Sequence, residues 1–129
     1  SACCVTVAKQ GAGVKIEKVV SVIDCGHYVN PDNVKAQTEG NIVMGITAAV
    51  KKGIMFTNGQ AEQTNFHQYQ VMRMNEMPAV EIHIVQSGAE PGGVGEPGLP
   101  PIAPALTNAV FAATGKRIRR LPFDLNTLA

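Results

Sequence analysis

The segment Pro31–Val50 constrains the fold more than any other part of the chain. Asn30 precedes it and is a favoured N-cap residue, Pro31 suits the first helical position, and Asp32 places negative charge in the first turn. We therefore predict one helix over this whole segment. Its second half, residues 42–50, is apolar on nearly all sides. A helix of that kind is buried in a core or between layers, so the remaining elements are expected to surround it.

Two glycines interrupt this predicted helix. Gly40 and Gly45 lower its intrinsic propensity, so we expect them to let another backbone come close. One helical stripe also carries amides, because Gln37, Asn41, Met44 and Ala48 share a face. At an apolar helix, Gln37 has two alternative roles: it satisfies backbone groups, or it binds a polar ligand.

The flanking segments predict strands. Residues 2–8 and 14–24 read as an antiparallel hairpin across the turn at Gln10–Gly13. In the second of these runs Val14, Ile16 and Lys18 alternate with Lys15 and Glu17. Asn58-Gly59 predicts a second, two-residue hairpin.

The second half of the chain mixes strand, loop and helix signals. Residues 79–85 alternate and predict a strand, and residues 101–114 predict a helix that stops at Gly115. We expect the C-terminal residues after Gly115 to add one short strand and a tail. Residues 64–78 have no period, which indicates an irregular packed loop anchored by Phe66, Tyr69, Val71, Met72 and Met74. The predicted class is α+β: an N-terminal hairpin, a buried central helix, a second hairpin and a strand, a Gly/Pro loop and a C-terminal helix.

The stretch from Ala89 to Pro104, AEPGGVGEPGLPPIAP, places a carboxylate among glycines and prolines. Gly95 and Pro97 flank Glu96 and restrict the local path of the backbone. A carboxylate held in this way can be aimed at one point, as general-base catalysis requires. The alternative interpretation is that Glu96 is an ordinary charge in a turn.

Composition excludes several classes of protein. A length of 129 residues fits one domain, and a net charge of +1 gives no field to attract nucleic acid or a membrane surface. The three cysteines contain no Cys-x-x-Cys, and His27, His67 and His83 lack a metal-ligand spacing, so no metal site is expected. No apolar run of about 18 residues predicts a membrane span. Charged residues make up only 16% of the chain, which favours a surface that partly faces other protein.

Three longer motifs, DCGHYVNPDNVKAQTEGNIVMGITAAV, RMNEMPAVEIHIVQSG and GGVGEPGLPPIAPALTNAVFAATGKRIRRLPF, resemble one known family. They are similar to the C-terminal end of the molybdopterin-binding large subunit of the xanthine oxidase family, in its isoquinoline and bacterial aldehyde oxidoreductase branch. The resemblance implies that Glu96 is the catalytic base beside molybdenum and that Gln37 contacts the pterin. It also implies that Gly93, Val94 and Gly95 line the same pocket.

The resemblance further implies a function for the complete enzyme. That function is a molybdenum hydroxylase that oxidises aldehydes or aromatic N-heterocycles with water-derived oxygen. The expected cofactor is molybdopterin, in the cytosine dinucleotide form. The expected partners are the remainder of the large subunit and a small iron–sulfur subunit.

Family subunits are several times longer than this chain, so we expect residues 1–129 to be a single-domain C-terminal fragment. The isolated chain is then expected to be inactive, to hold no cofactor tightly, and to associate with itself through exposed apolar faces. The alternative is a non-catalytic assembly module that retains the fold. Compartment, substrate identity and electron acceptor are left open.

Overall fold

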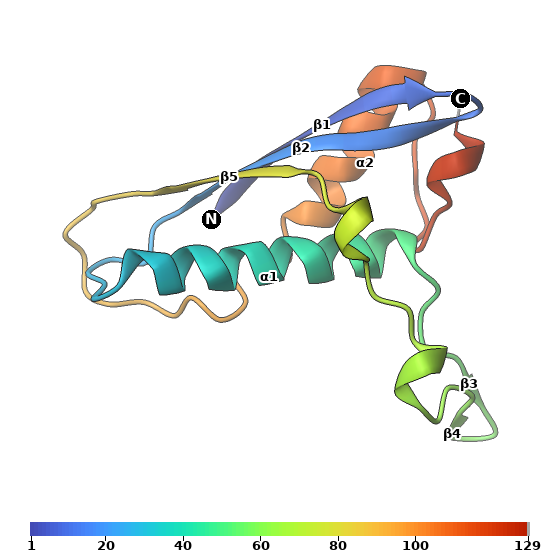
Figure 1. Cartoon of the computed structure of the whole chain (residues 1–129), viewed down its shortest axis with the longest axis horizontal. Helices are drawn as coiled ribbons and strands as arrows, with labels where there is room; N and C mark the ends of the chain where they lie inside the picture. The colour runs from blue at the N-terminus through green and yellow to red at the C-terminus, as the bar shows by residue number, and fades with distance from the viewer. Residues whose placement is uncertain (129) are drawn as a thin grey trace.

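A computed structural model describes residues 1–128 as a three-stranded sheet, two long helices and a projecting arm (Figure 1). The elements in chain order are β1 (Ala2–Gln10), β2 (Gly13–Ile23), α1 (Pro31–Val50), β3 (Phe56–Thr57), β4 (Gln60–Ala61), β5 (Ala79–Ile84) and α2 (Ile102–Thr114). Short 3₁₀ turns lie at η1 (Phe66–Gln68), η2 (Met74–Glu76) and η3 (Leu125–Thr127). The predicted α+β class is confirmed.

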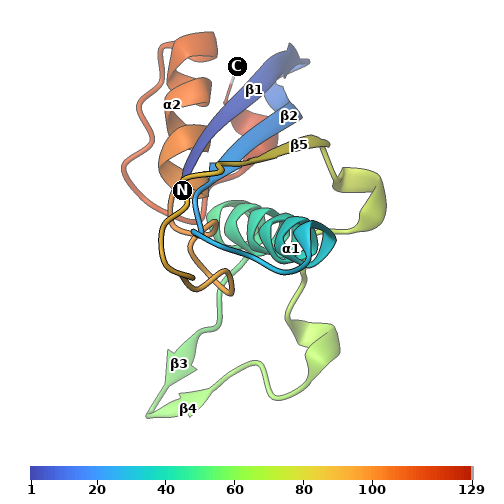
Figure 2. The ribbon, with the colours of Figure 1, turned by 90° about the vertical axis from the view of Figure 1, so that its left-hand side faces the viewer.

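The main sheet has the strand order β1-β2-β5. The predicted hairpin is present, since β1 and β2 pair antiparallel, and β5 joins β2 in parallel. Viewed from the end, α1 and α2 both lie beside this sheet (Figure 2). The core between sheet and helices is aliphatic, and its fully buried members are Val19, Ile42, Ile46, Ala49, Ile102, Leu106 and Val110.

A β-bulge in β2 interrupts the alternation that the sequence predicts for this strand. Thr6 pairs with Lys18 and Val7 with Ile16, so Glu17 is the extra residue. A bulge shifts which side chains face the core. The buried face therefore passes from Val14 and Ile16 to a new set after the bulge, Val19, Ser21 and Ile23. Lys18 leaves that face and forms an ion pair with Glu81 of β5, with 2.6 Å between Nζ and Oε2.

Helix α1 has the predicted bounds and the predicted cap. The Asn30 side chain accepts a hydrogen bond from the backbone N–H of Asp32 at 2.9 Å. The predicted buried central helix is confirmed, although Met44 is 42% exposed and Ala48 is exposed too. The apolar composition overstates burial because one face of α1 contacts neither the sheet nor α2.

The two helical glycines behave differently. A Cβ at Gly45 would lie 2.8 Å from Cβ of Ile102, so this glycine permits the close approach of α2. A Cβ at Gly40 would meet nothing within 4 Å, so the same expectation is wrong there. Helix α2 begins one residue later than predicted and ends at Gly115, whose φ of 74° is left-handed as a C-cap glycine allows.

Residues 51–78 leave the body and return to it as an arm, and the part with β3, β4 and η1 hangs below α1 in Figures 1 and 2. Its tip is the predicted hairpin, with positive φ at Asn58 and Gly59, 52° and 78°. The expectation of a packed loop is mostly wrong, because Phe66 and Met74 are 95% and 96% exposed. Without a period, the sequence does not show which of these apolar side chains reach a core. Of the predicted anchors, Met72 packs against the main core.

The predicted C-terminal strand is absent from the described residues. After Gly115 the chain returns past α1, where the N–H of Phe123 donates to the carbonyl of Ala49 at 3.0 Å. Turn η3 then packs against the start of β2, so closely that a Cβ at Gly13 would lie 2.2 Å from the Leu125 carbonyl. The described residues after Gly115 therefore cover one end of the hydrophobic core instead of extending the sheet.

Candidate functional site

The first half of the Gly/Pro loop is fastened to the segment that joins β2 to α1. The hydroxyl of Ser87 donates to Asp24 Oδ1 at 2.7 Å, and the N–H of Gly26 donates to the same oxygen at 3.0 Å. These two hydrogen bonds, with that of Ser87 the stronger cause, lower the pKa of Asp24. The N–H of Gly92 donates to the Cys25 carbonyl at 2.8 Å, so two segments far apart in sequence run side by side.

A hollow of about 310 Å³ lies between this loop and the first turns of α1. It contains two of the predicted site residues, Gln37 from the helix and Val94 from the loop. Val94 also packs on a small apolar cluster formed by Ile23, Cys25 and Val34. The other lining residues are mixed in polarity: Cys25, His27, Tyr28, Val29, Asn30, Asn33, Val34 and Gly92. The structure therefore brings the exposed amide of Gln37 and Val94 of the glycine loop to one hollow.

Gly93 and Gly95 lie on either side of Val94 and are exposed. A Cβ at either position would meet nothing within 4 Å. Their surface is open to an approaching molecule, and neither is needed for close packing inside this chain. The structure brings them next to the hollow through Val94, but they are not among its lining residues.

Glu96 is exposed and is not among the residues that line the hollow. Its side chain has no polar partner among residues 1–128. Its backbone, in contrast, is held: the N–H of Leu99 donates to the Glu96 carbonyl at 3.0 Å, and the Ser1 hydroxyl donates to the Pro97 carbonyl. The turn from Glu96 to Leu99 is thus fixed by its backbone, while the exposed carboxylate has no polar partner among the described residues.

Asn41 supports this turn from α1. It is 5% exposed, and a Cβ at the buried Gly98 would lie 3.2 Å from both Cβ and Nδ2 of Asn41. The sequence had placed Asn41 on the same stripe as Gln37 without assigning it a role. The signal that was available is an amide on an otherwise apolar helix next to a glycine-rich loop.

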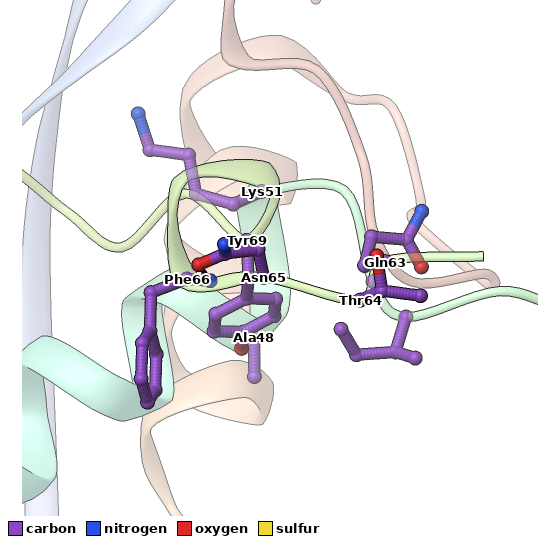
Figure 3. Close-up of a pocket in the computed structure, with 9 residues that line it drawn as sticks. Ala48, Lys51, Gln63, Thr64, Asn65, Phe66 and Tyr69 are labelled. Atoms are coloured by element: carbon purple, nitrogen blue, oxygen red, sulfur yellow. Dashed lines mark hydrogen bonds between the residues drawn. The ribbon is translucent and has the colours of Figure 1, made fainter. Parts of the chain in front are cut away.

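A larger hollow, of about 710 Å³, lies between the C-terminal end of α1 and the arm. Figure 3 shows Phe66 and Tyr69 from the arm near Ala48 of the helix. It contains no carboxylate and none of the predicted site residues. Size alone does not make a site, so the smaller hollow beside Gln37 is the better candidate.

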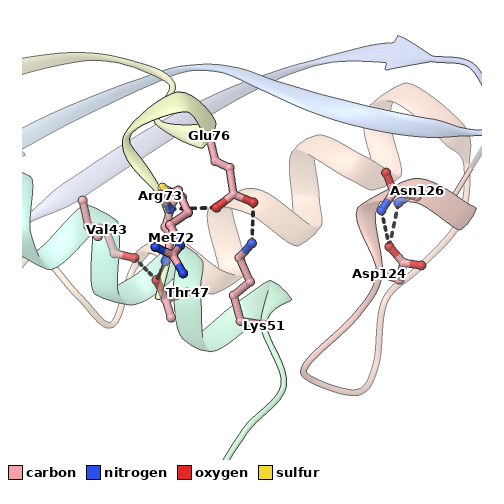
Figure 4. A network of polar contacts seen from close by, with 8 residues as sticks. All are labelled: Val43, Thr47, Lys51, Met72, Arg73, Glu76, Asp124 and Asn126. Atoms are coloured by element: carbon pink, nitrogen blue, oxygen red, sulfur yellow. Dashed lines mark hydrogen bonds and ion pairs between the residues drawn. The ribbon is translucent and has the colours of Figure 1, made fainter. Parts of the chain in front are cut away.

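A polar network ties the base of the arm to α1 (Figure 4). Lys51 binds Glu76, and the N–H of Arg73 donates to Glu76 Oε2 at 2.7 Å. The hydrogen bond from Lys51, followed by that from Arg73, lowers the pKa of Glu76. The Thr47 hydroxyl, which donates to the Val43 carbonyl, accepts the N–H of Met72 at 3.0 Å. Each polar group in this network has its partner inside the chain, so we assign the network a structural role and no role in ligand binding.

Residues 1–128 contain no group of three or more His, Cys, Asp or Glu side chains that could hold a metal ion. Within the same residues, no helix combines the length and the apolar character needed to cross a membrane. Arg117 of the basic run Lys116-Arg117-Ile118-Arg119-Arg120 is engaged within the chain, since it stacks on the Phe111 ring at 3.6 Å and donates to Asn108 at 3.0 Å.

Comparison with known proteins identifies the family. The family model described as a molybdopterin cofactor-binding domain matches residues 1–78, more than half of the chain. The chain belongs to this family. As the resemblance predicted, it is a fragment of the molybdopterin-binding subunit type of the xanthine oxidase family.

Curated relatives of this molybdopterin-binding chain agree with that assignment. It is 35% identical over 84% of its length to the beta subunit of isoquinoline 1-oxidoreductase from Brevundimonas diminuta. It is also 35% identical over 84% of its length to a protein of Gluconacetobacter polyoxogenes named membrane-bound aldehyde dehydrogenase [pyrroloquinoline-quinone]. In both cases the match spans 14% of the relative, so this chain corresponds to a small part of much longer proteins.

The fold has a counterpart among solved structures. Quinoline 2-oxidoreductase from Pseudomonas putida 86 superposes with a TM-score of 0.75 at 21% identity, over 88% of this chain and 16% of that one. At this identity the similarity shows the fold alone. The overall fold of this chain is therefore that of a part of the larger chain.

Proposed function

We propose that this chain is the base-bearing part of a molybdenum hydroxylase, with residues 1–129 forming one C-terminal domain of its large subunit. The observation that carries the proposal is the shared hollow between Gln37 and Val94, next to an intact Gly-Val-Gly-Glu-Pro element in a chain of the molybdopterin-binding family. The fold places the amide and the loop on one surface although they lie far apart in the sequence.

The residues at this surface fit a polar, ring-shaped cofactor. Gln37 presents an exposed side-chain amide that can both donate and accept hydrogen bonds. The open space over Gly93 and Gly95 lets a large group approach the backbone closely. In the proposal Gln37 holds the pterin, Gly93, Val94 and Gly95 form the adjacent wall, and the cofactor is the cytosine dinucleotide form of molybdopterin.

The molybdenum cofactor, when bound, supplies the oxygen-transfer and redox chemistry. The contribution of this chain is a base. A carboxylate oxygen of Glu96 takes the proton from a water-derived nucleophile, which then attacks an electron-poor carbon of the substrate. Because the turn from Glu96 to Leu99 is hydrogen-bonded, little backbone freedom is lost when the carboxylate is aimed.

The proposed substrates are aldehydes or aromatic N-heterocycles, and the proposed partners are the remainder of the large subunit and a small iron–sulfur subunit. Support comes from the relatives named above, which include an isoquinoline oxidoreductase and an aldehyde dehydrogenase. The name of the second relative includes pyrroloquinoline quinone, which is a different cofactor from molybdopterin. Metal analysis of the complete enzyme is therefore a direct test of the cofactor assignment. The exposed arm and the low charged fraction favour extensive contact with other protein.

The decisive experiment replaces Glu96 by Gln in the complete enzyme. General-base catalysis contributes roughly 10²–10⁴-fold, so kcat should fall by that factor while molybdenum content stays normal. Glu90→Gln is the matched control, because Glu90 is also exposed, lies in the same loop and precedes a proline. It should leave kcat unchanged. Retention of full activity by Glu96→Gln would remove the assigned role.

A second candidate has one observation in its favour. Glu96 is exposed and does not line the hollow. An exposed carboxylate with no partner in the chain is also what a non-catalytic assembly module would show. The Glu96→Gln variant separates the two candidates, since turnover should not change if the chain is an assembly module. In that case disruption of the arm should instead change the association of the subunits.

The isolated chain provides a separate test. Because it spans 14% of the relatives, we expect it neither to hold molybdopterin tightly nor to turn over substrate. Metal analysis of the purified 129-residue chain should find molybdenum far below one atom per chain. A stoichiometric amount would show that the fragment binds the cofactor by itself.

A further inference from the structure

Asn41 is a buried amide without a hydrogen-bond acceptor for its donor atom. It lies one turn after Gln37 on α1 and is 5% exposed. No acceptor for Nδ2 is present among residues 1–128. A buried donor without a partner is costly, so an asparagine at an apolar helix position calls for an explanation beyond packing.

The backbone of the Gly/Pro loop lies directly on this amide. A Cβ at Gly98 would be 3.2 Å from Asn41 Cβ and 3.2 Å from Asn41 Nδ2. Only a residue without a side chain leaves the amide undisturbed at that distance. Gly98 is buried although it belongs to an otherwise exposed loop, so the contact with Asn41 marks where the loop touches α1.

Gly98 belongs to the same turn as Glu96. The hydrogen bond from the Leu99 N–H to the Glu96 carbonyl closes this turn at 3.0 Å. On the other side, the thiol of Cys3 lies 3.2 Å from the Pro101 carbonyl, which ties the end of the loop to β1. The turn is thus held between β1 and α1. Because Gly98 is two residues from Glu96 within this hydrogen-bonded turn, a shift of the Asn41 side chain would also move Glu96.

We propose that Asn41 is a positioning residue that sets the turn carrying Glu96. This inference rests on the proposed role of Glu96 as the base. The Asn41 side chain packs against the turn at Gly98 and supports its backbone there, and so fixes where the Glu96 carboxylate points. A direct role in cofactor binding is less favoured, because Nδ2 is covered by the chain itself, whereas Gln37 is exposed.

The test replaces Asn41 by Leu in the complete enzyme, which keeps the branched shape but places bulkier, apolar methyl groups where the amide packs against Gly98. Misplacement of a catalytic group by about 1 Å costs on the order of 100-fold, so we expect kcat to fall about 10- to 100-fold with KM within about threefold. Molybdenum content should stay normal and the thermal midpoint should not fall, since a buried donor without a partner is gone. Hydrogen–deuterium exchange of the Leu99 amide should become faster.

Ile42→Val is the matched control, because Ile42 is the next residue of α1, fully buried and in contact with the main core. It should lower the thermal midpoint and leave both kcat and Leu99 exchange unchanged. Gly98→Ala is the second variant, since its methyl group would press on Asn41 and should also lower kcat. The double variant should be no worse than the more damaged single variant, as expected when two changes act on one contact.

Three outcomes would overturn the proposal. The first is unchanged kcat in Asn41→Leu while Glu96→Gln is inactive, which would leave the role of Glu96 intact. The second is a loss of molybdenum in proportion to activity, which would assign Asn41 to cofactor binding. The third is multiplication of the two single losses in the double variant. If Glu96→Gln itself stays active, the proposed function has failed, and Leu99 exchange in Asn41→Leu still decides whether the amide holds the turn.

Discussion

The two glycines of α1 predict opposite effects of the same substitution. Replacing a helix-interior glycine by alanine stabilises by roughly 0.5–1 kcal/mol, because alanine has less backbone freedom to lose. At Gly40 a new Cβ meets nothing within 4 Å, so Gly40→Ala should gain that amount. At Gly45 the Cβ would lie 2.8 Å from Cβ of Ile102, well inside the roughly 3.5–4.0 Å of a normal carbon contact.

The cost at Gly45 is therefore that of overpacking a core, about 1–3 kcal/mol. Two further atoms of Ile102 would lie at 3.0 and 3.1 Å, so α2 itself has to move. Because the helical gain is common to both variants, Gly45→Ala should be less stable than Gly40→Ala by about 1–3 kcal/mol. Against the parent, Gly45→Ala should then be neutral or destabilised by up to about 2.5 kcal/mol.

Urea unfolding of the 129-residue chain at 25 °C measures the difference. With a slope of about 2 kcal/mol per molar urea, the middle of the usual range, the unfolding midpoints of the two variants should differ by roughly 0.5–1.5 M, provided that their slopes agree. Equal increases in midpoint for both variants would show that α1 and α2 are not in contact at Gly45. The reasoning on helix packing, and with it the place of the loop that enters α2, would then be wrong.

Three other predictions concern the loop and the arm. Gly26→Ala should destabilise by more than about 1–2 kcal/mol in thermal unfolding, since φ is +67° and the Cβ would lie 2.1 Å from the Glu90 carbonyl; wild-type stability would refute the close approach. Because the pKa of Asp24 is lowered by folding, its stabilisation is present above about pH 4 and lost as the pH falls through the folded pKa. Ser87→Ala should therefore reduce the loss of stability between pH 7 and pH 3 in urea unfolding, and an unchanged loss would exclude this hydrogen bond as the cause. Phe66→Ser should reduce self-association of the isolated chain in sedimentation, since Phe66 is 95% exposed, and an unaltered distribution would place the contact elsewhere.

Local signals in the sequence were sufficient for much of the fold. Asn30 and Pro31 define the start of α1 because capping depends on neighbouring residues alone. Asn58-Gly59 likewise defines a turn, since both residues tolerate positive φ. The bulge at Glu17 was not predictable, because it depends on how β1 pairs with β2. For the same reason the parallel pairing of β5 with β2 could not be predicted from local signals.

The candidate site was predicted in part. Glu96 and Gln37 were singled out by the residues around them, and the resemblance assigned their roles. Whether Gln37 and Val94 share a surface is a matter of long-range packing, which the structure resolves through the hollow. The role of Asn41 escaped the sequence, because the stripe that contains it gives no indication of which loop covers it.

The parallel pairing of β2 with β5 has a consequence for the order of folding. The hairpin of β1 and β2 joins neighbouring segments, so its loop is cheap to close and it can form early. Strand β5 reaches its place only after α1 and the whole arm have been traversed, which makes its addition a slow, non-local step. Until then one edge of β2 carries free backbone groups, and a nascent chain that ends in the arm exposes that edge to any other strand.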